Sequence, residues 1–119
     1  MAVTKITPVK LALNTFSPAL TFTAPTSATD GFAVDFKEHD YKTVILAQNT
    51  AAGAKTIKVL KGTGIQGVAD TDAVSLAASA IVAINLESGA FKQLSGANKG
   101  CVVVIPESTD IKLAAVVTP

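Results

Sequence analysis

The feature that most restricts the fold of this chain is a period of two in its apolar residues. Phe32, Val34 and Phe36 alternate with small or charged residues, and the same alternation appears in residues 82–86 and 111–117. Successive side chains of a β-strand point to opposite faces of its sheet, so this spacing indicates strands with one buried face. An apolar face has to be covered by another layer, which favours two packed sheets.

Segments of this kind recur at short intervals, and Gly, Asn, Asp and Ser separate them. They comprise residues 9–13, 19–23, 32–37, 43–48, 56–61, 74–76, 80–87, 101–105 and 111–117. Residues 49–53 have a turn composition, so we expect 43–48 and 56–61 to form a hairpin. The predicted fold is all-β, an antiparallel two-sheet β-sandwich of about eight strands, jelly-roll or immunoglobulin-like.

One segment allows a second interpretation. Residues 77–80 are Ala-Ala-Ser-Ala, a composition that favours a helix by intrinsic propensity. The alternation of Val82, Ile84 and Leu86 favours a strand instead. Residues 76–86 are therefore predicted as strand, with a helix as the alternative.

The 119 residues are enough for one domain, and their composition changes near residue 28. Residues 1–28 are rich in Thr, Pro, Ser and Ala, and Pro8, Pro18 and Pro25 interrupt any helix. We expect this part to be an extended N-terminal arm that includes the first strand or strands. Residues 29–119 are expected to form the β-sandwich domain.

Composition limits the partners that such a domain could bind. Hydrophobic residues make up 49% of the chain, which is high for a small soluble body and predicts that a partner covers some apolar surface. The net charge is +1, and all ten basic residues are Lys. A chain without a strong positive electrostatic field and without Arg is not expected to bind nucleic acid or an anionic membrane.

The N-terminus lacks the charged start and long apolar stretch of a secretory signal, and no apolar run is long enough to span a bilayer. We therefore expect synthesis and folding in the cytoplasm without a membrane step. The single cysteine, Cys101, begins an apolar run and is predicted to be buried. No internal disulfide is possible.

Residues 62–67 spell GTGIQG, the glycine spacing of a dinucleotide-binding loop, with Glu87 further along the chain. Such a loop must open a helix and lead into a parallel strand, but residues 68–72 continue as Val-Ala-Asp-Thr-Asp. We interpret the segment as a loop that needs residues with positive φ, and we expect no cofactor there.

Two groups of acidic residues could suggest a metal site. Asp35, Glu38 and Asp40 lie near His39, but Lys residues are interleaved with them and Asp35 is predicted to face solvent from a strand. Asp70 and Asp72 lack the other ligands of a calcium loop. We predict charged surface turns and no metal.

Nucleophilic catalysis requires a base and an orienting group beside the nucleophile. His39 is the only histidine, Cys101 is predicted to lie within a strand, and no Gly-x-Ser-x-Gly elbow occurs. We therefore predict no catalytic residues, and a binding or structural protein instead of an enzyme.

Several segments carry a resemblance to a known group of proteins. They are residues 40–50 (DYKTVILAQNT), 54–59 (AKTIKV), 64–70 (GIQGVAD), 86–92 (LESGAFK) and 95–100 (SGANKG). Their strand pattern and turn sequences resemble those of small virion proteins of tailed bacteriophages, most closely the capsid decoration, or head auxiliary, proteins. The resemblance covers roughly residues 30–117 and includes no catalytic signature.

The resemblance implies a β-sandwich that binds the outside of the phage head, contacts the major capsid protein and itself as a homo-oligomer, and is located in the virion. The N-terminal arm is the candidate contact, because an extended segment can lie across a neighbour or add a strand to its sheet. Its candidate anchors are Val3, Ile6, Val9 and Leu11. The alternative is that the arm packs on its own domain as a first strand.

Two expectations accompany this hypothesis. Deleting the first dozen residues should weaken capsid attachment and leave the fold intact. The alternative function is a tail, fibre or adhesin-type recognition module that binds host carbohydrate, and such a module would bind cells or glycans without any capsid.

Overall fold

The computed structural model describes residues 3–27, 30–36, 42–62, 70–71, 73–86, 91–94 and 96–119, and these contain almost no helix. The prediction of an all-β chain is confirmed. Nine strands are found in the described residues: β1 (Val3–Ile6), β2 (Val9–Lys10), β3 (Gly31–Asp35), β4 (Thr43–Asn49), β5 (Lys55–Val59), β6 (Val74–Leu76), β7 (Ile81–Asn85), β8 (Cys101–Pro106) and β9 (Ile111–Val117).

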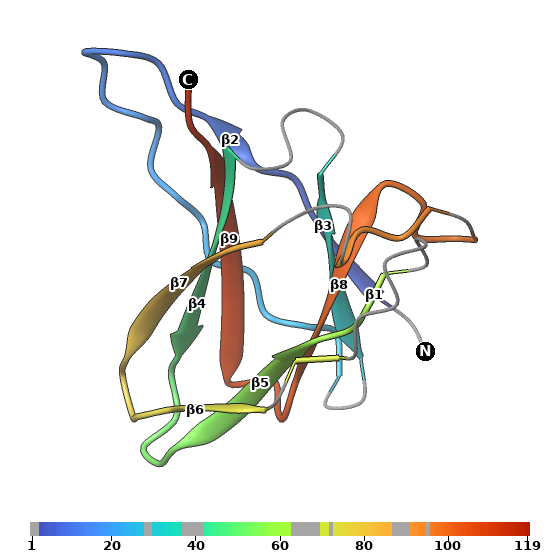
Figure 1. The fold of residues 1–119 in the computed structure, drawn as a ribbon. Coiled ribbons are helices and arrows are strands. Elements are labelled where there is room, and N and C mark those ends of the chain that lie inside the picture. The colour runs from blue at the N-terminus through green and yellow to red at the C-terminus, as the bar shows by residue number, and fades with distance from the viewer. Residues whose placement is uncertain are drawn as a thin grey trace.

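The strands form two sheets (Figure 1). The five-stranded sheet has the order β1-β3-β8-β5-β6, and the four-stranded sheet has the order β2-β9-β4-β7. One apolar core takes its side chains from both sheets, including Phe32 and Val104 from the first and Ile45 and Leu113 from the second. The apolar alternation therefore has its expected consequence, because the inward side chains of each sheet are covered by the other.

Strand burial is most regular in β4, where buried and half-buried residues alternate over all seven positions. The continuous apolar run of β8 is buried almost throughout, because β8 lies between β3 and β5 in the middle of its sheet. The strand interpretation of residues 76–86 is confirmed for Leu76 at the end of β6 and for the five residues of β7. A turn at Ala77–Ala80 separates β6 from β7, and in it Ala80 donates a backbone hydrogen bond to Ala77.

The expectation of purely antiparallel sheets is wrong for two strand pairs. β1 pairs with β3 in parallel, and β2 pairs with β9 in parallel. Parallel neighbours need a long connection, and residues 7–30 supply one between β1 and β3. Hairpin spacing could not indicate these pairs, because the N-terminal arm joins strands that are distant from it in the sequence.

The predicted hairpin of residues 43–48 and 56–61 is also wrong. β4 pairs with β9 and β7 in one sheet, whereas β5 pairs with β8 and β6 in the other. The intervening residues 50–54 instead cross between the two layers, which lie about 10 Å apart in packed sheets. The predicted strand at residues 19–23 is reduced as well, since these residues contribute a single bridge from Thr23 to Leu113.

A buried amide fixes this crossing. The Asn49 side chain is fully buried, and its Nδ2 donates to the carbonyl oxygens of Gly53 and Leu76 at 3.0 Å each and of Ala77 at 3.2 Å. Its Oδ1 accepts a hydrogen bond of 2.9 Å from the backbone of Ala51. Asn49 therefore joins the β4–β5 connection to the β6–β7 connection, which are two of the connections by which the chain changes sheets.

The two sides of the molecule differ in how their sheet edges end. On one side, the N-terminal arm supplies the edge strand of each sheet, β1 beside β3 and then β2 beside β9 (Figure 1). On the other side, the edges are β6 and β7, which are consecutive in sequence but belong to different sheets. The arm thus links the sheets along one side, and only a short turn joins them along the other.

Candidate interaction surfaces

The structure places the four sequence-predicted anchors on the protein's own domain. Ile6 is buried in the core, and Val3, Val9 and Leu11 are half-buried. The Leu11 amide donates to the Val117 carbonyl at 2.8 Å. The arm thus forms first strands of the domain itself, and a role of these four residues in binding a partner stays a prediction.

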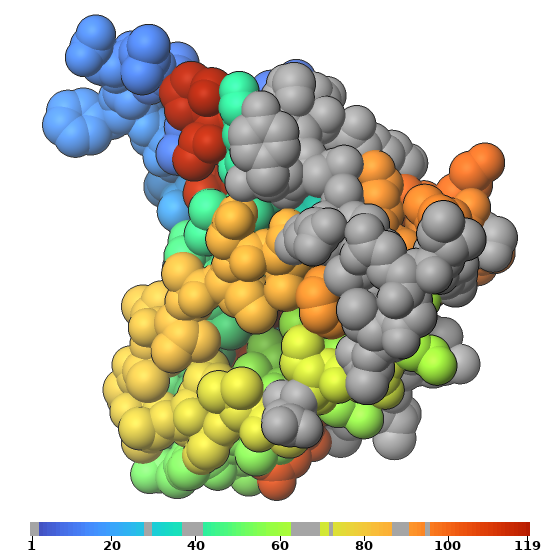
Figure 2. All heavy atoms as spheres, in the orientation of Figure 1, coloured from blue at the N-terminus to red at the C-terminus, as the bar shows by residue number. Residues whose placement is uncertain are grey.

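Beyond β2 the arm forms a loop that projects from the body, seen in blue at the upper left of Figure 2. Its tip exposes two large apolar side chains, Leu13 at 76% and Phe16 at 100%. Local hydrogen bonds shape the tip, from Thr15 Oγ1 to the Leu13 carbonyl at 3.2 Å and from Ser17 Oγ to the Pro18 carbonyl at 2.9 Å. Asn14, with φ of 58°, turns the backbone. An apolar tip on a projecting loop is a candidate anchor for another protein.

The sequence pattern does not indicate this tip. It predicts Leu13 as the end of a strand and assigns no role to Phe16. The available signal was a bulky aromatic residue between Thr15 and Ser17, shortly before Pro18. Polar turn-forming neighbours indicate a loop, where a large apolar side chain has no strand face to pack against.

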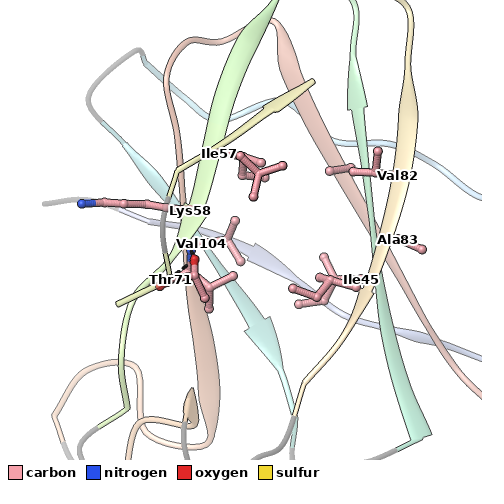
Figure 3. Close-up of a pocket in the computed structure, with 11 residues that line it drawn as sticks. Ile45, Ile57, Lys58, Thr71, Val82, Ala83 and Val104 are labelled. Atoms are coloured by element: carbon pink, nitrogen blue, oxygen red, sulfur yellow. Dashed lines mark hydrogen bonds between the residues drawn. The ribbon is translucent and has the colours of Figure 1, made fainter. Parts of the chain in front are cut away.

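The second candidate surface is a groove on the side of the molecule where β6 and β7 are the sheet edges. It lies between β5 and β6 of one sheet and β4 and β7 of the other (Figure 3). It has a volume of about 240 Å³. Ile57 faces Ile45 and Val82 across the hollow, and Val104 lies at its base. The lining is almost wholly apolar, because the Lys58 side chain points away and the Thr71 hydroxyl accepts a hydrogen bond of 2.8 Å from the Val59 amide. The groove therefore suits an apolar contact better than a polar substrate.

The groove lies between β7 of one sheet and β5 and the three-residue β6 of the other. Val82 and Ile84 pair with Ala47 and Ile45 of β4, so they point to the inner face of their sheet. They are nevertheless about 40% exposed, at 40% and 39%. Inward-facing residues that stay exposed mark a place where the two-layer packing is incomplete.

The sheet edges in the described part of the chain are protected to different degrees. β1 carries the charged Lys5, β2 has two residues and β6 has three. β7 has five exposed residues without charge or proline. Charges, proline and shortness are the usual means by which edge strands avoid pairing with other chains, and β7 has none of them.

Only Gly62 of the glycine-rich motif lies within the described residues. An added Cβ at Gly62 would lie 2.5 Å from the Lys92 carbonyl oxygen and 2.8 Å from the Phe91 carbonyl carbon. Its φ is not in the left-handed region, so the reason for glycine here is close backbone approach instead of the expected positive φ. Gly62 brings the chain after β5 against residues 91–92.

We predict that Gly62→Ala lowers the free energy of unfolding by about 1–3 kcal/mol, because backbone atoms on both sides would have to move. Gly53→Ala is the matched control, since an added Cβ there meets nothing within 4 Å. The control should be neutral or stabilising by up to about 1 kcal/mol. Urea denaturation of both variants measures the difference, and equal stabilities would contradict the close-approach explanation.

The acidic groups do not form a site in the described structure. Glu38, His39, Asp40 and Asp72 lie outside the described residues. Asp35 is half-buried at the end of β3. Asp70 Oδ1 accepts a hydrogen bond of 2.7 Å from the Lys61 amide, which assigns it a loop-stabilising role. In the ranges that the structure describes, no three His, Cys, Asp or Glu side chains are grouped as a metal ion would require.

Cys101 is buried in β8, as the sequence predicts. Lys5 Nζ of the neighbouring arm lies 4.0 Å from its Sγ. The thiol is packed within the sheet, and its surroundings are those of a small core residue.

Comparisons of the chain with protein-family models, with curated proteins and with solved structures found no match. No helix in the described ranges is long and apolar enough to cross a membrane. The class that fold and surfaces define is thus an all-β domain of two mixed sheets with two exposed apolar surfaces.

Proposed function

We propose that this protein is a non-enzymatic virion structural protein, a capsid decoration protein that binds the outer surface of a phage head and stabilises it. The proposal includes a finer description of the fold, in which the two mixed sheets are a β-sandwich of jelly-roll or immunoglobulin-like type. Its partner is the major capsid protein, and its location is the virion surface.

The observation that carries this proposal is the exposed apolar tip of the N-terminal arm. A fully exposed Phe16 next to an exposed Leu13 is an unfavourable arrangement in water unless another surface covers it. A projecting loop can enter a depression between subunits that a flat sheet face could not reach. The resemblance of residues 30–117 to decoration proteins supplies the identity of that surface.

The proposal also fits the energetics of binding to a symmetric shell. Each copy needs only a modest contact, because many equivalent sites are occupied and a bridging copy ties neighbouring subunits together. Such a contact needs apolar area and no reactive group. The tip and the groove both supply apolar area.

We predict that Phe16→Ser weakens binding to empty capsids by about tenfold to a hundredfold. The side chain would bury on binding, and burying a Phe is worth about 1.5–3 kcal/mol. Co-sedimentation of the purified protein with shells, at several protein concentrations, measures the apparent affinity. The fold should be unaffected, because Phe16 has no covered surface in the isolated protein.

Leu94→Ser is the matched control. Leu94 is also an exposed apolar residue, at 54%, but it belongs to the segment drawn in orange at the right of Figure 2, across the view from the tip. The control should bind shells like the unchanged protein. Equal binding by the unchanged protein, Phe16→Ser and Leu94→Ser would show that the tip does not contact the shell. Binding to cells or glycans without binding to shells would support the recognition-module alternative instead.

A further inference from the structure

Among the described strands, β7 is the last of its sheet, and the direction of the outer backbone groups of Ile81 and Ala83 can be derived from its pairing with β4. The Asn49 amide donates to the Ala80 carbonyl at 3.0 Å, and the same register continues through Ala47 with Val82 and Ile45 with Ile84. In an antiparallel pair, alternate residues direct both backbone groups to the partner strand, and the residues between them direct both away. The N–H and C=O groups of Ile81 and Ala83 therefore point outward, away from β4.

The side chains of β7 divide between its two faces. Val82 and Ile84 point into the apolar groove, and Ile81 and Ala83 lie on the opposite face. Ile81 is 56% exposed. A strand that meets this edge would therefore gain backbone hydrogen bonds at Ile81 and Ala83 and apolar contacts on both faces.

We propose that β7 is a self-association surface, at which a second copy of this chain pairs antiparallel with β7 about a two-fold axis through Ala83. In this register Ala83 lies opposite Ala83 of the partner subunit, and their outward N–H and C=O groups bond reciprocally. Val82 lies opposite Ile84 of the partner subunit on the groove face. The two four-stranded sheets would become one continuous sheet.

The choice of a second copy, and not an unrelated strand, follows from the symmetry and charge of β7. A two-fold interface needs a surface that is complementary to itself. The apolar residues Val82 and Ile84 flank Ala83 symmetrically, so the two-fold matches apolar with apolar. β7 carries no charged side chain, so two copies meet without repulsion between like charges.

The expected dimer is weak, because two strands and a groove bury less than the roughly 1,200–2,000 Å² of a stable interface. Its weakness is compatible with a role on a surface where neighbouring copies are held close together. The inference does not depend on the capsid, because it concerns the purified chain alone.

Sedimentation equilibrium over a wide range of protein concentrations tests the proposal. The unchanged protein should approach twice the mass of one chain as the concentration rises. Ala83→Pro should weaken dimerisation at least tenfold, because it removes the N–H at the two-fold axis. This N–H points away from β4, so the substitution keeps the pairing within the subunit, as proline on an edge strand does. Circular dichroism and thermal unfolding check that the variant is folded.

A second variant gives a positive signal. Residues that exchange hydrogen bonds across an antiparallel pair have Cα atoms about 5.5 Å apart, within the range of a disulfide. Ala83→Cys should therefore form a covalent dimer under mild oxidation. Ala78→Cys, in the exposed turn before β7, is the matched control and should cross-link far more slowly.

The outcomes separate this surface from others. A protein that stays monomeric at all concentrations would overturn the proposal, and so would a dimer that Ala83→Pro leaves unchanged. A dimer lost on Phe16→Ser but kept in Ala83→Pro would also overturn it, because the arm tip would then be the contact. Loss of dimers in Ala83→Pro with retained binding to shells would support the β7 surface and leave the proposed function standing.

Discussion

Asn49→Ala is expected to lower the free energy of unfolding by about 3 kcal/mol or more. The substitution removes a fully buried amide and leaves the carbonyls of Gly53 and Leu76 and the Ala51 amide without their side-chain partner. A buried polar group that loses its partner costs about 1–3 kcal/mol. This amide also holds together two connections between the sheets. We therefore expect its removal to lower the free energy of unfolding at least as much as Gly62→Ala does.

Chemical denaturation followed by circular dichroism measures this loss. Gln48→Ala, on the neighbouring residue, is the matched control, because Gln48 is half-buried on the other face of β4 and should change stability by less than about 1 kcal/mol. A midpoint for Asn49→Ala close to that of the unchanged protein would mean that water replaces the amide. Asn49 would then not determine how the chain changes sheets.

Local sequence patterns were sufficient to place most strands, because a strand with one buried face places apolar side chains at every second residue. The strands β4 and β9 and the buried run of β8 are all found where the sequence predicts them. The Ala-rich residues before β7 form no helix. The residues that follow them form β7, whose backbone pairs with β4. Tertiary pairing therefore outweighed a small intrinsic preference.

Strand partners could not be predicted in the same way, because they depend on contacts between distant residues. The turn composition of residues 49–53 is the same for a hairpin and for a crossing between layers. The deciding contact is from Asn49 to Leu76, which lies far along the chain. Likewise, nothing local to Val3–Ile6 indicates that β1 runs parallel to β3.

The candidate surfaces were predicted only in general terms. The high apolar content indicated that some apolar surface is available to a partner, but exposure of a given residue depends on what covers it. Val82 and Ile84 have the pattern of buried residues and remain exposed because they line an open groove. Phe16 is exposed because its loop extends beyond the sheets (Figure 2).

Removal of residues 1–10 is expected to destabilise the whole domain, in contrast to the sequence-based expectation of an intact fold. This segment contains β1, an edge strand of the five-stranded sheet, and β2, an edge strand of the four-stranded sheet. Burial of Ile6 accounts for about 1.5–3 kcal/mol, and each backbone hydrogen bond of the arm adds about 0.5–1.5 kcal/mol. We expect a total loss of about 4 kcal/mol or more and a decrease in Tm of about 15 °C or more.

A truncated protein that fails to bind shells would therefore not identify the arm as a contact, because a partly unfolded domain also fails to bind. Thermal unfolding of the truncated chain and of Phe16→Ser separates the two effects. Phe16→Ser should keep the Tm of the unchanged protein, and the truncation should not. If the truncated chain instead kept its full Tm, β1 and β2 would contribute little to the domain, and the arm would be available to pair with a neighbouring subunit.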